Sequence, residues 1–199
     1  MSSPSLEEKL AQYQEFFAIE YEFSVNIKVI ESDKGEKFDL FLQDMPAPFK
    51  LATDMGDIDQ TALRSIQNLG ASAAQLVSFL NQQSQKIDLL IGYILSQQDA
   101  EKFRYKGNKF GGGGINFIAK NAFNVGQLVE LKIFLSGSHC AIYSYGEIIE
   151  VTDHDHQFTH KVIFHFIREE DRELLVRNSL QEQAKQLQKL AKLRNESSN

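Results

Sequence analysis

Apolar residues repeat every three or four positions along the segment from Ala62 to Ile94. A repeat that averages about 3.5 residues places its members on one stripe of an α-helix and winds such helices into a left-handed supercoil. The members of this stripe are Ile66, Leu69, Ala73, Leu76, Leu80, Gln83, Ile87, Leu90 and Ile94. At about 1.5 Å of rise per residue the helix would be about 50 Å long, more than a domain of this size covers. The pattern therefore predicts oligomerisation through a coiled coil.

The apolar face is wider than the seam of a two-stranded coiled coil. The residues that flank the stripe are Val77, Phe79, Ile91 and Tyr93. Such a face favours three or four strands, or a seam that also docks on a globular body. Gln83 is the one polar core residue, and pairing with its own copies would fix their alignment at a cost in stability. The alternative is an amphipathic helix folded back on its own domain, and Gly70 and Gly92 would each weaken the helix by about 1 kcal/mol.

The N-terminal residues combine a helical repeat with an alternating pattern. A short helix is expected over residues 6–19, with Ser5 as its N-cap. Apolar and polar residues then alternate from Phe23 to Ile30, which predicts a half-buried strand. After a turn at residues 32–35, the apolar residues within 38–42 suit a return strand. This part therefore predicts a helix and strand segment ahead of the long helix.

Short apolar runs separated by turns follow the long helix. Residues 98–114 are basic and glycine-rich and show no helical pattern. The apolar runs lie at residues 115–117, 128–135, 140–151 and 162–167. Antiparallel strands at this spacing predict a small barrel or sandwich. A closing helix over residues 169–194 has its own repeat through Leu180, Ala184, Leu187 and Ala191, so it either covers the barrel and ends in solvent, joins the coiled coil or receives a partner.

The composition limits the classes of protein that fit. The 199 residues are 42% hydrophobic, enough for a real core, and the net charge of −6 argues against general nucleic-acid binding. There is no signal-peptide pattern, and no apolar run approaches the roughly 20 residues of a membrane span. Cys140 is the only cysteine, so a reducing compartment fits. We therefore expect a soluble, cytoplasmic protein.

The order of elements after the long helix resembles a known family. A glycine-rich turn is followed by strands, by Gly146-Glu147-Ile148-Ile149, and by an aromatic segment that passes straight into an acidic helix start within 164–175. Over residues 102–185 this order resembles a PilZ domain, which implies a six-stranded β-barrel closed by a C-terminal helix and, in typical members, binding of cyclic di-GMP. The heptad segment from Leu80 to Leu90 is similar to an atypical branch of that family, and this resemblance implies a tetramer.

The nucleotide-binding turn of typical PilZ domains, [D/N]-x-S-x-x-G, is altered in this chain. Aligning its last glycine with Gly114 puts Lys109 where an aspartate or asparagine belongs and Gly111 where the serine belongs. A shift by one residue recovers Asn108 but puts Phe110 at the serine position. Neither alignment keeps the carboxylate or amide together with the hydroxyl that the resemblance implies for the ligand.

The R-x-x-x-R segment, whose arginine forks bind phosphate and stack on guanine, is also missing before the barrel. Arg104 is the only arginine near the expected barrel start, and Arg168 and Arg172 have the right spacing but are expected on the wrong side of the barrel. We therefore expect that high-affinity binding of cyclic di-GMP has been lost. The residues available for any remaining binding are Arg104, Lys106, Asn108, Lys109, Gly111, Gly112, Gly113 and Gly114.

The glycine run from Gly111 to Gly114 is not a Walker-type phosphate loop, because Ile115 stands where that loop needs lysine. A flexible strand start that lets two backbones approach closely is the favoured interpretation. An anion site made by Lys106, Lys109 and the glycine amides is the alternative.

Residues 153–160 contain ligand types for a transition metal, with Asp153, His154, Asp155 and His156 in sequence and His160 nearby. They fall between two predicted strands, where a solvated hairpin loop is expected and nothing orients the ligands. The adjacent His139 and Cys140 lack a third group that would complete a nucleophilic site. We therefore expect neither a metal site nor a catalytic residue, and a metal-dependent enzyme ranks last among the alternatives.

The sequence as a whole predicts an α+β protein in which a PilZ-like barrel is carried on a coiled-coil helix. The expected regions are an N-terminal helix and strand segment at 1–56, the oligomerisation helix at 57–98, and the barrel with its closing helix at 99–199. The predicted function is that of a non-enzymatic regulatory or adaptor protein of bacterial cyclic di-GMP signalling. It would act by contact with another protein and need no cofactor, and a genuine cyclic di-GMP receptor is the alternative.

Overall fold

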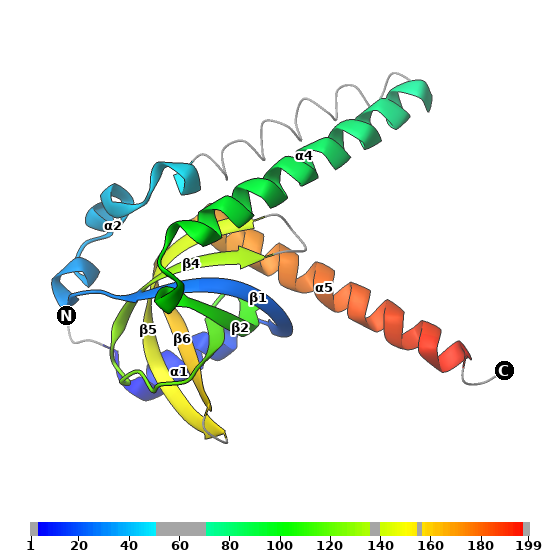
Figure 1. Cartoon of the computed structure of the whole chain (residues 1–199). Coiled ribbons are helices and arrows are strands. Elements are labelled where there is room, and N and C mark those ends of the chain that lie inside the picture. The colour runs from blue at the N-terminus through cyan, green and yellow to red at the C-terminus, as the bar shows by residue number, and fades with distance from the viewer. Residues whose placement is uncertain (1–3, 51–70, 136–139, 155–156, 197–199) are drawn as a thin grey trace.

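A closed antiparallel β-barrel forms the body of the protein. The computed structural model describes residues 4–50, 71–135, 140–154 and 157–196. The strands are β1 (Ala18–Val29), β2 (Arg104–Gly111), β3 (Gly114–Ala119), β4 (Leu128–Leu135), β5 (Cys140–His154) and β6 (Gln157–Ile167). They pair in the order β1-β2-β3-β6-β5-β4, and the barrel closes where β4 meets β1 (Figure 1). The predicted α+β class and small barrel are confirmed.

Strand β1 is part of the barrel, although the sequence places residues 1–56 in a separate N-terminal segment. Val25 of β1 lies opposite Tyr105 of β2 on one side and opposite Ile133 of β4 on the other. The alternating pattern predicted a strand here, but β1 begins at Ala18 and not at Phe23. Helix α1 ends at Glu15, so the prediction of helix up to residue 19 is wrong at its end. The alternating pattern could not identify the partners of β1, because these strands lie far along the chain beyond the long helix.

Strand β2 lies within a segment whose glycines and lysines hide the alternating pattern of a strand. Tyr105 and Phe110 pack against the barrel core, while Gly107 leaves room for the ring of Phe23. A Cβ atom at position 107 would lie 2.1 Å from that ring. A glycine therefore takes the place of an apolar residue because its neighbour across the sheet fills the space.

The barrel interior contains the main apolar core. Every second residue along each strand faces inward, as expected for a pleated strand. Ile27, Ile115, Leu131 and Ile142 are among the side chains with at most 1% of their surface exposed. Leu175, from the first turns of the C-terminal helix, is also fully buried in this core and covers one end of the barrel.

Several helices surround or leave the barrel. The main ones are α1 (Leu6–Glu15), α2 (Phe38–Asp44), α4 (Ala71–Gln98) and α5 (Glu169–Glu196). Helix α1 has the predicted cap, in which the Ser5 hydroxyl accepts a bond from the Glu8 N–H and the Glu8 carboxylate accepts one from the Ser5 N–H. Figure 1 shows α4 and α5 extending beyond the barrel as two diverging arms. None of the described helices is long and apolar enough to cross a membrane.

Helix α2 occupies residues for which the sequence predicts a return strand, so that prediction is wrong. Phe38, Phe41 and Leu42 also recur at helical spacing, and the helix turns Phe41 fully inward. The Phe41 ring packs against Tyr143 and Tyr145 on the outer face of β5, with centroid distances of 5.6 and 5.1 Å. Tertiary packing on these aromatic rings selects the helix over the short alternating pattern.

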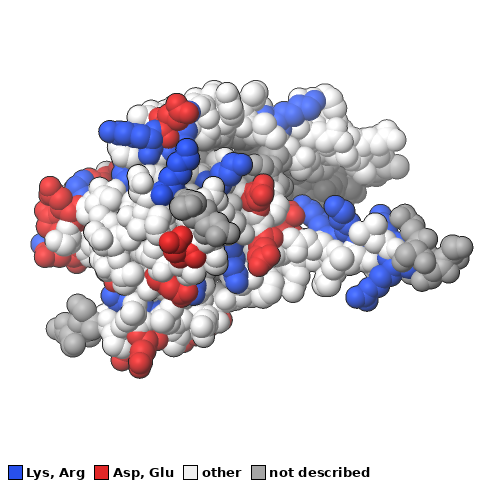
Figure 2. Space-filling model, turned by 60° about the horizontal axis from the view of Figure 1, so that its bottom comes forward, with Lys and Arg blue, Asp and Glu red and all other residues white. Residues whose placement is uncertain are grey.

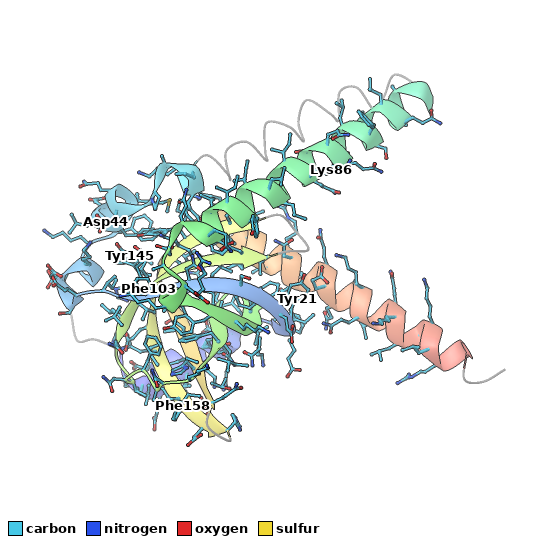
Figure 3. All side chains as sticks on the ribbon, in the orientation of Figure 1. Tyr21, Asp44, Lys86, Phe103, Tyr145 and Phe158 are labelled. Carbon is cyan, nitrogen blue, oxygen red and sulfur yellow. The ribbon has the colours of Figure 1, made fainter. Side chains whose placement is uncertain are left out.

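A second apolar core lies outside the barrel and joins α2 and the base of α4 to strands β4 and β5. Its buried members are Phe41, Met45, Phe49, Leu95, Phe134, Ala141, Tyr143 and Tyr145. The hydroxyl of Tyr145 donates to Asp44 at 3.0 Å, and the two residues lie side by side in Figure 3. Asp44 also forms an ion pair with Lys34 at 2.7 Å. This core fixes the base of α4 on the barrel.

Candidate functional site

The predicted oligomerisation stripe is exposed on α4. Ile66 and Leu69 lie outside the described residues, and we call the remaining seven members the α4 stripe. These are Ala73, Leu76, Leu80, Gln83, Ile87, Leu90 and Ile94. The exposed fractions of the five large apolar members are 52% for Leu76, 38% for Leu80, 56% for Ile87, 59% for Leu90 and 58% for Ile94. In the single chain the α4 stripe is therefore largely open to solvent.

Among the described residues of α4, one side of the helix is covered and the other is exposed. Val77 and Leu95 are buried, whereas the flanking residues Phe79, Ile91 and Tyr93 are exposed. Figure 3 places Lys86 on the projecting part of the helix, away from the barrel. The described part of α4 extends from its docked base as an arm with an apolar outer face.

A buried carboxylate at the base of α4 ties the helix to the barrel. Asp99 is 7% exposed and accepts hydrogen bonds from Lys28 of β1, from Asn26 of β1 at 3.0 Å, and from Lys132 of β4 at 2.9 and 3.2 Å. Burial alone would raise the pKa of Asp99, but the bonds from Lys28, Lys132 and Asn26 outweigh it and lower the pKa to about 2. Asp99 therefore stays ionised and bound to two strands.

Arg104, a predicted ligand residue, instead caps the C-terminal end of α4. Its guanidinium donates to the main-chain oxygen of Gln97 at 2.7 Å and to that of Asp99 at 2.8 and 3.1 Å. Carbonyls at this end of a helix have no partner within the helix and carry partial negative charge, so a cation stabilises them. The Asp99 and Arg104 bonds together hold α4 at its base.

The glycine run covers the end of β2, the connection between the strands and the start of β3. All four glycines are buried. The last residues of α1 and the chain after it pack directly on it. A Cβ atom at Gly111 would lie 2.2 Å from the main-chain oxygen of Phe17, and one at Gly113 would lie 2.8 Å from that of Tyr13. The close approach of two backbones was the interpretation favoured from the sequence, and the structure confirms it.

Arg172 of α5 also reaches the glycine run, which corrects the expectation that it lies on the wrong side of the barrel. Its Nη1 donates to the main-chain oxygen of Gly112 at 2.7 Å, and its guanidinium lies 5.3 Å from the centre of the Phe16 ring. The cause is the pairing of β3 with β6, which brings the end of β6 beside Gly113. Helix α5 follows β6 directly, but this pairing is not visible in the sequence.

Two solved structures are similar in fold to this chain. One is a pathogenic protein from Xanthomonas campestris, described as a new tetrameric PilZ domain self-assembled via an unusual helical bundle. It is 14% identical to this chain with a TM-score of 0.50, and the match covers 89% of this chain and 96% of that one. The barrel has a PilZ fold.

A second similar structure is the inhibitor of motility MotI/DgrA of Bacillus subtilis. It is 9% identical with a TM-score of 0.46, and the match covers 85% of this chain and 51% of that one, so this chain spans about half of its length. No protein-family model matches the chain, and no curated protein matches it either.

The polar residues predicted to remain around a nucleotide lie along strand β2 of the PilZ barrel. Lys106 is exposed opposite Ser24 of β1, and Lys109 is half-buried opposite Glu20. The side-chain oxygen of Asn108 is buried without a hydrogen-bond partner among the described residues. These side chains belong to a paired strand, while the glycine amides that would complete the site lie under α1 and α5.

His160, counted with the metal-ligand types, lies inside the barrel wall on β6 and is not in the predicted hairpin loop. It is fully buried, stacks on Phe117 at 4.6 Å, and its Nε2 accepts a bond from the main-chain N–H of Phe123 at 3.0 Å. Burial lowers its pKa, so the ring is neutral. Within the strand, the His160 ring packs against the rings of Phe117 and Phe123.

The other members of that predicted metal group are only partly described. Asp153 and His154 end β5, whereas Asp155 and His156 lie outside the described residues, as does His139. Within the ranges that the structure describes, no three histidine, cysteine, aspartate or glutamate residues are grouped so that they could hold a metal ion.

Proposed function

We propose that this protein is a non-enzymatic PilZ-type adaptor of bacterial cyclic di-GMP signalling that assembles through the α4 stripe and acts by contact with another protein. The observation that carries the proposal is the exposure of five large apolar residues along one face of a docked helix. Each such side chain gains about 1.5–3 kcal/mol when it is buried. A second copy of the same stripe supplies the complementary surface.

The charge distribution on α4 suits self-association. Lys86 and Asp88 are the only charged residues among the 28 residues of the described helix, so copies of α4 do not repel one another strongly. In Figure 2 the charged residues, drawn in blue and red, gather on the barrel and near the end of one projecting arm. Much of the other arm is white, which marks uncharged residues. An uncharged apolar face of this length is typical of a helix–helix interface.

We further propose a tetramer. The flanking residues Phe79, Ile91 and Tyr93 are exposed beside the stripe, which makes the face wider than a dimer seam needs. The likeness of fold to a PilZ protein described as tetrameric through a helical bundle supports the same proposal. Assembly would multiply weak contacts of each barrel with a partner through avidity.

We propose that nucleotide binding is weak or lost. The segment before the first barrel strand is α1, and residues 1–17 contain no arginine that could provide the R-x-x-x-R pair. The cation available there, Lys9, forms an ion pair with Glu147 at 2.6 Å. Together with the covered glycine run, this favours an adaptor over a receptor. The single cysteine supports a reducing, cytoplasmic location.

The test of assembly is the mass in solution by light scattering of the unchanged protein and of Leu80→Asp. We expect a mass of several chains for the unchanged protein and 22.6 kDa, the mass of one chain, for Leu80→Asp, because a charge cannot be buried unpaired in an apolar seam. Gln85→Asp is the matched control, since Gln85 is exposed on the same helix outside the stripe, and it should keep the mass unchanged. An unchanged protein of 22.6 kDa would contradict the assembly.

A cyclic di-GMP receptor is the second candidate, supported by the PilZ fold and by Lys106 and Lys109 on the strand that leads to the glycine run. Calorimetric titration with cyclic di-GMP separates the two candidates. The adaptor proposal expects no binding heat at high ligand concentration. Micromolar binding that disappears in Lys109→Glu, but not in Lys37→Glu on the α2 side, would instead establish the receptor.

A further inference from the structure

Helix α1 is attached to the barrel by a small set of contacts at separate points. Lys9 forms an ion pair with both carboxylate oxygens of Glu147 on β5, at 2.6 and 2.8 Å. The Tyr13 hydroxyl donates to the Asn116 side chain on β3 at 2.9 Å. Lys161 lies 5.7 Å from the centre of the Tyr13 ring. These contacts place α1 across strands β3, β5 and β6.

The apolar contacts of α1 are separate from the barrel core. Tyr13 is the only buried residue among those of the helix, and it packs with Leu10 on Ile149 and Ile163. These residues form a cluster of their own on the outer face of the barrel, whereas the main core lies inside it. Loss of α1 would therefore leave the interior of the barrel intact. Elements with so few buried contacts open at lower free energy than the core.

The glycine run is shaped to receive the end of α1. A Cβ atom at Gly112 would lie 2.6 Å from the Phe16 ring and 2.7 Å from the Val176 side chain of α5. A Cβ atom at Gly113 would meet main-chain atoms of Tyr13 at 2.8 and 3.2 Å. Neither glycine has a backbone conformation reserved for glycine. At Gly113 a side chain is therefore excluded by Tyr13 of α1, whereas at Gly112 it is excluded by Phe16, directly after α1, and by Val176 of α5.

We propose that α1 is a detachable strap. It closes the barrel face that contains Gly111–Gly114, Asn116, Ile149 and Ile163, and it leaves this face as a unit while the barrel stays folded. This face becomes accessible only after α1 has left. The strap does not rest on the assembly proposed above, because in Figure 1 α1 lies behind the lower half of the barrel, whereas α4 projects from its upper side.

The first test is hydrogen exchange of the full chain carrying Gly113→Ala. The new methyl group must push Tyr13 away, whereas the turn can accept an alanine. We expect amides of residues 6–15 to exchange about tenfold faster or more, with the rates of strands β1 to β6 unchanged. Gly92→Ala is the matched control, because a Cβ atom there would meet no atom within 4 Å, and it should leave α1 unchanged. Equal acceleration of α1 and the barrel strands would overturn the proposal.

The second test reverses the ion pair and does not depend on the glycine run. Lys9→Glu and Glu147→Lys should each accelerate exchange in residues 6–15, because each leaves two like charges in contact. The double variant restores opposite charges and should return α1 to the rate of the unchanged protein. A double variant that exchanges as fast as the single ones would show that this contact does not hold the strap, and would overturn the proposal.

Discussion

At the scale of single residues, Ser144 is a polar group placed in an apolar interior. It is fully buried, lies opposite Leu131 and Ile167 inside the barrel, and its hydroxyl has no hydrogen-bond partner among the described residues. We expect Ser144→Ala to raise the free energy of unfolding by about 1 kcal/mol, because an unsatisfied buried hydroxyl is removed. Urea unfolding measures the change. Ser24→Ala, on the exposed face of β1, is the control and should shift it by less than about 0.5 kcal/mol.

At the scale of elements, Asp99 determines how firmly α4 sits on the barrel. Its pKa is about 2 in the folded protein, below the ordinary value of 3.8 for an aspartate, so ionised Asp99 stabilises the fold at neutral pH. This stabilisation is complete above pH 4 and is lost as the pH falls through about 2. We expect Asp99→Asn to cost about 2 kcal/mol of unfolding free energy at pH 7.

The measurement is urea unfolding of both proteins between pH 7 and pH 2. The difference in free energy of unfolding between the unchanged protein and Asp99→Asn should shrink as the pH falls below 4. Protonated aspartate and asparagine are both uncharged. Asp153→Asn, near the exposed end of β5, is the control and should change the free energy of unfolding by less than about 0.5 kcal/mol. A difference in free energy of unfolding that stays constant from pH 7 to pH 2 would mean that the charge of Asp99 does not stabilise the base of α4.

Local patterns predicted those elements whose neighbours are also close in sequence. The apolar runs of β4 and β5 and the closing helix α5 appear in the structure close to their expected bounds, whereas β6 begins at Gln157 and not at residue 162. The prediction for residues 38–42 is wrong, because its apolar residues fit an alternating pattern as well as a helical one. Packing of Phe41 on Tyr143 and Tyr145 selects the helix. Strand β2 was missed because its interior position is a glycine that makes room for Phe23.

At the scale of the whole molecule, the proposed assembly makes stability depend on protein concentration. Association of folded chains through the α4 stripe stabilises them by mass action. We therefore expect the Tm of the unchanged protein to rise when its concentration is raised about a hundredfold, while the Tm of Leu80→Asp stays constant. Differential scanning calorimetry at several concentrations measures both. Identical behaviour of the two proteins would argue against assembly through this helix.

The sequence by itself determined which residues form the α4 stripe and most of the barrel strands, because a helical repeat and an alternating pattern depend only on spacing along the chain. Tertiary structure alone decided where β1 joins the barrel, why Arg104 caps α4, and how Arg172 and α1 meet at the glycine run. Each of these contacts joins residues brought together by strand pairing or chain reversal, and spacing along one chain does not specify which distant segments will pair.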